Sequence, residues 1–454
     1  MSMLTRRQCV RLLPPRKIFP VVVISVLLIA TSTMRTQEVL TLQQCMTLAL
    51  ENHETVQIGG NAVKISESRA AEARSGYIPK VTVNADYKYF LELPHQLMPL
   101  STFNPMAQEG QFKEAQFGVP HNANASITAS MVLYSPQIGG AISGASTATE
   151  LARLQKTQSE DALRYSVALA YYQAQLLEHQ RDFASGNLEN SRRLLASTQL
   201  LYQQLMVKKT DVSRVELQIE QIESRIEFLR SSYEQVMLTL KMLMGAEPNS
   251  QISVAPLAIP DGPEASAPRY IDQEVLQGQK KLLENEINWL QKSRYLPTIS
   301  VVAQYGLNGF GYDKAPNEFI KTYPVGFVGL QLTYPVFNGT ATVEKIQQKE
   351  LELSNNLLQQ QLVTHKTVVE TQNAINRLEL SKQTLHTTRH QVEFADEIYR
   401  QVVLQQKEGT ASLADVLLAD GALREAQQGY ITASTEFLKA RLELLRLNGL
   451  LSSL

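Results

Sequence analysis

Apolar residues recur with a helical period in two equivalent stretches of the chain. From Val215 to Leu243 they follow one another in alternating steps of four and three residues, and a second series from Ala419 to Leu447 has the same steps, each member 204 residues after its counterpart. Such steps keep side chains on one face of a helix. Each series ends just before a glycine, Gly245 or Gly449, the residue that most often follows a helix. Two equivalent amphipathic helices are therefore predicted.

Segments typical of strands are duplicated as well. Tyr77-Ile78-Pro79 precedes a run that alternates apolar and polar residues, and Tyr295-Leu296-Pro297 precedes a similar run 218 residues later. In each half the pattern predicts a helix, a strand, a second strand, a very long helix and a shorter helix. The expected ranges are 41–75, 80–91, 124–134, 140–205 and 211–244, then 269–293, 298–308, 325–334, 340–407 and 412–448. The loops at about 92–123 and 308–324 are expected to face the exterior.

These halves define the expected domains. Residues 33–246 form the first repeat and residues 269–454 the second, joined by a linker at 247–268 whose five prolines disfavour a helix or a central strand. Residues 1–32 have the features of a signal peptide: a basic start, the apolar run Ile18–Ala30 and small residues for cleavage. That run is shorter than the roughly 20 residues of a membrane-spanning helix. A short uncleaved anchor is the alternative.

The long helices need partners. A helix of 66 residues would reach about 100 Å, and no compact domain surrounds such a rod. The heptad stripe of the first long helix predicts packing along other helices. The two shorter helices of that half together match its length, so we expect them to lie end to end beside it. Polar residues interrupt the stripe of the second long helix, which fits either a helix facing a wet lumen or one facing bulk solvent.

The four strands alternate between an apolar and a polar face, with tyrosines near their ends, as transmembrane barrel strands do. A small antiparallel sheet packed on a core is the alternative. Four strands cannot close a membrane barrel, and an open edge in lipid leaves backbone groups unpaired. The sheet would therefore be completed by other copies of the chain, and three copies would supply 12 strands.

Composition and motifs exclude several functions. Lys and Arg (43) nearly balance Asp and Glu (44), so no basic surface for nucleic acid is expected. Cys45 alone remains after the leader, which excludes an internal disulfide and a cysteine zinc site. No phosphate loop, nucleophile elbow or metal motif occurs, and His386 and His390 lack the glutamate of a zinc peptidase helix. We expect no cofactor and no enzyme activity.

In order and duplication these features resemble the TolC-type outer-membrane efflux and secretion channel family, the outer-membrane factors. The matching segments span the mature chain: Leu42–Leu50, the two Tyr-x-Pro strand entries, Tyr334–Gly339, and Gly409-Thr410 through Asp415-Val416-Leu417 to Ala419. The resemblance implies a mostly α fold with β strands: a homotrimer with a 12-stranded β-barrel in outer-membrane lipid and a periplasmic α-helical barrel. It implies the outer membrane of a Gram-negative bacterium. It also implies a passive exit duct for small molecules or proteins that works with a periplasmic adaptor and an inner-membrane pump.

The resemblance also implies a closed tip at the helix hairpins, near 203–215 and 405–419. The family places a tyrosine, an arginine and two aspartates there, but this chain keeps only Asp415, and the other positions hold Gln406, Ala411 and Leu418. A ring of Asp415 carboxylates would then give the constriction a preference for cations. The alternative is that Asp415, like Asp211, complements the dipole at a helix N-terminus. A periplasmic adaptor and a coiled-coil tether remain alternatives for the whole chain.

Overall fold

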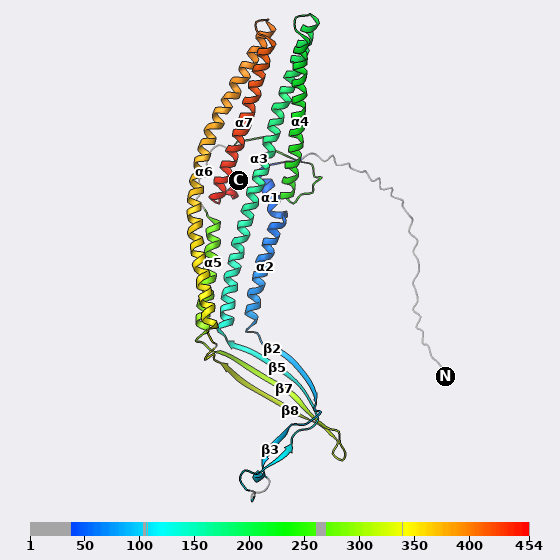
Figure 1. Cartoon of the computed structure of the whole chain (residues 1–454), viewed down its shortest axis with the longest axis vertical. Helices are drawn as coiled ribbons and strands as arrows, with labels where there is room; N and C mark the ends of the chain where they lie inside the picture. The colour runs from blue at the N-terminus through cyan, green and yellow to red at the C-terminus, as the bar shows by residue number, and fades with distance from the viewer. Residues whose placement is uncertain (1–37, 103–105, 107, 260–268, 338, 454) are drawn as a thin grey trace, which may run out of the picture.

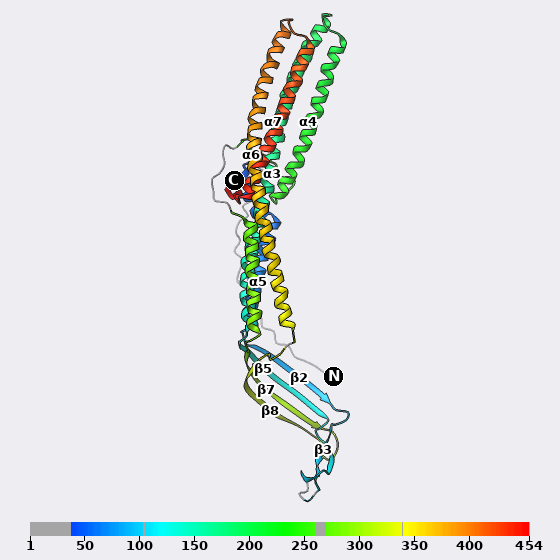
Figure 2. The same cartoon turned by 60° about the vertical axis from the view of Figure 1, so that its left-hand side comes forward.

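The chain is an elongated molecule with a sheet at one end and long helices extending from it (Figures 1 and 2). The structure is a computed structural model and describes residues 38–102, 106, 108–259, 269–337 and 339–453. The predicted signal peptide, residues 1–32, lies outside the described residues. Both helix hairpins turn at the end of the molecule farthest from the sheet (Figure 1).

The order of elements is the same in the two repeats. The first contains α1 (Leu42–Asn52), α2 (Glu54–Ser75), β2 (Lys80–Tyr89), β5 (His121–Tyr134), α3 (Pro136–Gln203) and α4 (Lys209–Leu243). The second contains α5 (Ile271–Ser293), β7 (Thr298–Tyr312), β8 (Phe319–Thr333), α6 (Ala341–Lys407) and α7 (Leu413–Leu447). The predicted fold class, mostly helical with two strands in each repeat, is confirmed.

The predicted helix stacking is confirmed as well. α3 and α6 contain 68 and 67 residues and are each about 100 Å long. α2 and α4 both pack along α3, one toward the sheet and the other toward the tip (Figure 1). α5 and α7 pack along α6 in the same way, and α5 also contacts α3.

The prediction of a single helix at 41–75 is wrong, because the helix is interrupted at His53 between α1 and α2. That residue has an extended backbone (φ −68°, ψ 133°) and caps α2 through Nδ1, which accepts a hydrogen bond from the Thr55 amide at 3.2 Å. Apolar periodicity continues across the break, so the pattern alone does not reveal it. α3 also begins earlier than expected, at Pro136, since proline suits the first turn of a helix.

The linker contributes a short strand to the middle of the molecule. β6 (Ile252–Val254) pairs in parallel with β1 (Glu38–Leu40). Gln175 of α3 anchors the following residues by donating from Nε2 to the carbonyl oxygens of Ala255 and Pro256, at 2.7 and 3.0 Å. Both strands of a two-stranded pair are edges, so prolines just outside β6 are tolerated. The largest buried apolar cluster surrounds this pair and includes Cys45.

The main sheet is antiparallel, with strand order β2-β5-β7-β8. The predicted loop at 308–324 is largely wrong, because β7 continues to Tyr312 and β8 begins at Phe319. β8 includes Pro324, because an edge strand tolerates the missing N–H of proline. The other predicted loop, 92–123, contains a hairpin of β3 (His95–Pro99) and β4 (Phe112–Gln116) as well as the start of β5.

Candidate functional site

One face of the four-stranded sheet is apolar across every strand. Because residues opposite each other in an antiparallel pair share a face, the register assembles the rows Val81/Ala129/Ala303/Val328, Val83/Ile127/Tyr305/Gly326 and Ala85/Ala125/Leu307/Pro324. The rows on the other face include Thr82/Thr128/Gln304/Phe327 and Asp86/Asn124/Asn308/Tyr323, which are polar in β2, β5 and β7 and aromatic in β8. The alternation seen strand by strand in the sequence thus becomes one continuous apolar surface.

Protein does not cover this apolar face. Val83 is 72% exposed, Tyr305 66% and Val328 78%, and no helix packs on the sheet within the described residues. A water-soluble sheet buries one face against a core, so the alternative of a small globular sheet is wrong. The 11 steps along β5 from Ala123, opposite Tyr87, to Tyr134 span about 26 Å at a 45° tilt. This matches the apolar band of a membrane barrel, about 25 Å tall.

The sheet has unpaired edges, and α6 has an exposed apolar face. β2 and β8 each pair on one side only, so both edges of the sheet are open. On α6, four exposed apolar residues at spacings of seven, four and seven share the helix face opposite the buried one: Leu351, Leu358, Leu362 and Val369. Contiguous exposed apolar surface on a helix marks an interaction surface.

At the tip, Asp415 is part of a local helix cap. Its Oδ2 accepts hydrogen bonds from the backbone amide and the hydroxyl of Ser412, at 2.8 and 2.7 Å, while the Ser412 hydroxyl accepts from the Asp415 amide. These hydrogen bonds from Ser412 lower the pKa of Asp415, so the carboxylate stays charged. The side chain remains exposed.

Asp211 occupies the equivalent position in the first hairpin. Its Oδ2 accepts from the Lys208 amide at 3.1 Å, and Oδ1 lies 3.6 Å from Arg214. Leu418, three residues after Asp415, is its neighbour on the surface of α7 and is 76% exposed, while Ala411 is half-buried in the turn before this helix. Gln406 lines a cavity of about 500 Å³ between α3 and α6. Within one copy, therefore, Asp415 and Leu418 share one part of α7, whereas Asp211 belongs to the other hairpin.

A buried polar cluster near the tip was missed by sequence reasoning. Asp420 of α7 is 1% exposed and accepts a hydrogen bond at 2.5 Å from Gln218 of α4, whose Nε2 also lies 3.2 Å from the Ser191 hydroxyl of α3. Arg424 Nε lies 2.9 Å from the same Asp420 oxygen. The cluster therefore ties the first hairpin to the second. The available signal was a charged residue directly beside the apolar stripe of α7, next to Ala419.

Burial controls the charge of this cluster. It raises the pKa of Asp420, an effect that Arg424 and Gln218 partly oppose. On α6, burial together with the charge of Asp420 raises the pKa of Tyr399 to about 12. The nearby phenol therefore stays neutral, and Asp420 is the group whose charge must be balanced where the hairpins meet.

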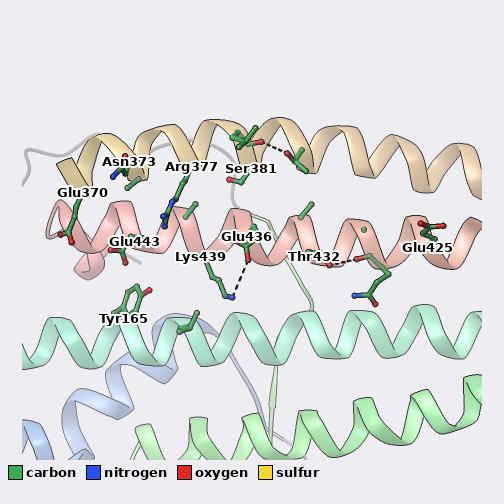
Figure 3. A pocket seen from close by; sticks show the side chains of 18 residues that line it. Tyr165, Glu370, Asn373, Arg377, Ser381, Glu425, Thr432, Glu436, Lys439 and Glu443 are labelled. Carbon is green, nitrogen blue, oxygen red and sulfur yellow. Dashed lines mark hydrogen bonds and ion pairs between the residues drawn. The ribbon is translucent and has the colours of Figure 1, made fainter. Parts of the chain in front are cut away.

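A longer groove lies between α6, α7 and α3 (Figure 3), with a volume of about 990 Å³. Its floor is made of small and apolar residues such as Ala374, Gly429 and Ala433, and its walls carry charged side chains. Several of these are paired within α7, as Lys439 is with Glu436 at 3.8 Å. Its lining includes the Tyr165 hydroxyl, which hydrogen-bonds the Glu443 carboxylate, and burial raises the pKa of Tyr165.

None of the described helices is both long and apolar enough to cross a bilayer. The described residues also contain no group of three or more His, Cys, Asp or Glu side chains that would hold a metal ion.

Residues 287–450 match the sequence profile of the outer membrane efflux protein family. No curated protein sequence matches the chain. Among solved structures the chain is similar to the outer membrane protein VceC from Vibrio cholerae, with 14% identity and a TM-score of 0.70 over 90% of this chain and 96% of that one. It is also similar to the outer-membrane channel OprN, with 15% identity and a TM-score of 0.71 over 90% and 89%. A third is the MtrE outer membrane channel of Neisseria gonorrhoeae, with 16% identity and a TM-score of 0.67 over 90% and 88%. The chain therefore has the fold of these channels over nearly its whole described length.

Proposed function

We infer that the chain is a TolC-type channel of the outer membrane efflux protein family, and that three copies of it form a passive exit duct across the outer membrane of a Gram-negative bacterium. The observation that carries this proposal is the sheet, which has one unbroken apolar face and two open edges. An edge left open in lipid costs several kcal/mol for each unpaired backbone group. The sheet is stable in a membrane only when other copies complete it.

Strand direction permits this closure. Each neighbouring pair in the order β2-β5-β7-β8 is antiparallel, so β2 and β8 run in opposite directions. β8 of one copy therefore joins β2 of the next as a further antiparallel pair, and three copies make a ring of 12 strands. Two copies would make eight strands, whose interior is filled by side chains.

The helices support the same arrangement. α6 follows β8 in the chain and lies at one side of the molecule, whereas α2 and α4, from the repeat that contains β2, lie at the other (Figure 1). α2 and α4 carry exposed apolar residues of their own: Ile58, Ile65, Leu217, Phe228 and Leu238. We assign these as the surface that receives α6 of the neighbouring copy, which closes a helical tunnel in the periplasm.

We propose that the duct itself is passive and that an energy source acts on it from outside. We propose that it works with a periplasmic adaptor and an inner-membrane pump and carries small molecules or proteins outward. At the tip, three Asp415 carboxylates, one from each copy, would give the constriction its preference for cations. A coiled-coil tether gives no reason for a membrane-sized apolar sheet.

The test is reconstitution with a pair of variants on opposite faces of β2. The wild-type chain is expected in the outer membrane as a heat-modifiable trimer that conducts ions in planar bilayers. Val83→Lys places a charge on the apolar face and is expected to cost about 2–4 kcal/mol per copy and to block insertion. Asn84→Lys, one residue later on the polar face, is expected to insert and conduct.

Two results would overturn the proposal. One is recovery of the wild-type chain as a monomer in the soluble periplasmic fraction. The other is equal insertion of the two lysine variants, because the apolar face would then have no contact with lipid.

A further inference from the structure

The sheet meets the helices at a basic collar, which we define as residues 74–80, 134–141, 289–298 and 333–345. Its sequence contains five cations and one acid: Arg74, Lys80, Lys292, Arg294 and Lys345 against Glu344. All five cations are exposed. The chain as a whole has a net charge of −1, so this concentration of positive charge is local.

The opposite end of the sheet has the reverse balance. Its connecting segments, 90–120 and 313–321, contain five acidic residues and three lysines: Glu92, Glu109, Glu114, Asp313 and Glu318 against Lys113, Lys314 and Lys321. The collar is therefore not one of two similar rims. Positive charge gathers only at the end from which the helices extend.

A cavity opens at this collar between α3, α5 and α6, with a volume of about 590 Å³. Its floor consists of small residues of α3, including Gly140 and Gly144, and Trp289 of α5 forms a wall. Trp289 packs so closely on α3 that a Cβ added to Gly140 would lie 2.8 Å from the Trp289 Cβ. Small residues on α3 thus keep the space open beside the indole ring.

The charged residues in the lining of the cavity are two lysines and one glutamate, Glu286. Lys345 and Lys349 of α6 line it; Lys349 is already paired with Glu286 and Glu352, at 3.0 and 2.8 Å. Lys345, by contrast, makes no ion pair with any described residue. Lys292 places its Nζ 4.9 Å from the Trp289 ring centroid, next to the same wall. The cavity therefore combines an apolar floor with ammonium groups that lack an acidic partner in the protein.

The position of the cavity along the molecule places it at the level of the lipid headgroups. The apolar face of the sheet ends at this collar, so the collar lies at the level where lipid headgroups follow the hydrocarbon. Arg294 lies 5.5 Å from the ring of Tyr295, which is 65% exposed and leads into β7. β7 lies between β5 and β8, away from the open β2 edge. Aromatic rings with adjacent cations are the usual anchors of this layer.

We propose that the cavity and its basic rim bind the headgroup of an anionic phospholipid in the periplasmic leaflet, with Lys345, Lys292 and Arg294 supplying the positive charge. The phosphate meets these cations, and the first part of an acyl chain lies on the glycine and alanine floor beside Trp289. This inference rests on the proposed function, because it requires the sheet to span the membrane. It adds the class of lipid that the channel recognises.

Trp289 is the only tryptophan of the chain and gives a direct readout. The trimer is reconstituted in two kinds of phosphatidylcholine vesicle. One contains brominated phosphatidylglycerol and the other contains the same fraction of brominated phosphatidylcholine. In both lipids the bromine is on the acyl carbons nearest the headgroup. We expect brominated phosphatidylglycerol to quench Trp289 fluorescence severalfold more effectively at low salt. Each cation removed by Lys345→Gln or Arg294→Gln is expected to lower this preference about fivefold, until it reaches unity.

The control is Lys314→Gln combined with Lys321→Gln, which removes two cations at the opposite end of the sheet and is expected to leave the preference unchanged. Equal quenching by the two lipids, or a preference that survives in the collar variants, would overturn the inference. Conductance in phosphatidylcholine alone separates this failure from failure of the proposed function. A channel that conducts there without lipid preference refutes only the lipid site, whereas a chain that forms no channel in either lipid refutes the duct.

Discussion

The two long helices occupy corresponding places in the two repeats and have nearly equal lengths, yet they meet different surroundings. α3, with 68 residues, buries 16 of them, whereas α6, with 67, buries four: Asn356, Ala374, Ser381 and Tyr399. α3 has its main contacts with α1, α2, α4, α5 and α7, whereas α6 has its main contacts with α5 and α7.

This difference shows that duplication of a sequence pattern does not duplicate its environment. The first repeat places its long helix inside the protomer, and the second places its long helix at the boundary. The apolar face of α6 and the open edge of β8 are therefore two parts of one unfinished side. In the proposed trimer a neighbouring copy completes both at once, which would account for the mixed rather than clean apolar stripe of the second helix.

The largest expected effect comes from charging the exposed face of α6. Leu358 and Leu362 are 60% and 64% exposed in one copy, and full burial of a leucine contributes about 2 kcal/mol. The double variant Leu358→Glu, Leu362→Glu removes this contribution at all three interfaces and would bury six unpaired charges. We expect the heat-modifiable trimer to be lost on gel electrophoresis.

The matched control is Gln359→Glu, which places a charge on an exposed flank of the same helix. It is expected to leave the trimer intact. A stable trimer of the double leucine variant would mean that α6 faces water in the assembly, and the contrast between α3 and α6 would then have another origin.

The next largest effect concerns a residue that has no equivalent in the first repeat. Asp420 is buried, but the residue 204 positions earlier is Glu216, which is exposed. Asp420→Ala leaves Gln218 without its acceptor and Arg424 without its counter-ion, and we expect a loss of about 3 kcal/mol in the free energy of unfolding. Glu216→Ala is expected to change it by less than about 0.5 kcal/mol. Denaturant unfolding followed by circular dichroism compares the two, and equal losses would show that the cluster does not stabilise the tip.

A smaller effect separates the two capping aspartates, Asp415 and Asp211. Either substitution to asparagine weakens the same kind of helix cap, but only Asp415 is exposed and free of a neighbouring arginine. A ring of like charges can concentrate counter-ions about tenfold at low salt. Asp415→Asn is therefore expected to lower the cation-to-anion permeability ratio by up to that factor, with little change for Asp211→Asn. An unchanged ratio in bilayer recordings would leave Asp415 with a capping role alone.

The sequence predicted the helices and strands well because periodicity reports which faces are buried. The steps of four and three from Ala419 to Leu447 placed α7 within a residue at each end, and alternation from Val81 to Tyr89 placed β2. The ends of the strands beside the second loop were placed less well. Most of the predicted loop at 308–324 belongs to β7 and β8.

The buried polar contacts near the tip could not be predicted from periodicity. A local motif such as Ser412-x-x-Asp415 is visible in sequence because its partners are three residues apart. The cluster of Asp420, Gln218 and Ser191 joins residues about 200 positions apart, and no periodicity links them. Such a cluster requires the spatial relation between the two hairpins, which follows only once α3 and α7 are known to be neighbours.

The smallest effect is a pair of opposite pH dependences in α7. Burial raises the pKa of Asp420 above its ordinary value of 3.8, whereas hydrogen bonds from Arg446 lower the pKa of Glu443 below 4.5. A raised carboxyl pKa favours the protonated native state, so the contribution of Asp420 to stability falls as pH rises from 3.8 to its native pKa and then levels off. The contribution of Glu443 is present above pH 4.5 and is lost as pH falls through its lower native pKa.

Two differences in unfolding midpoint are measured at a series of pH values on both sides of 3.8 and 4.5. The first is wild type minus Asp420→Asn, and the second is wild type minus Glu443→Gln. The first difference is expected to decrease with rising pH and the second to increase. The position that corresponds to Glu443 in the first repeat is Thr239, so Thr239→Ala serves as a control with no titrating group. If both carboxyl differences changed in the same direction, Asp420 would not be desolvated in the assembled tip, and the two hairpins would be separated there by water.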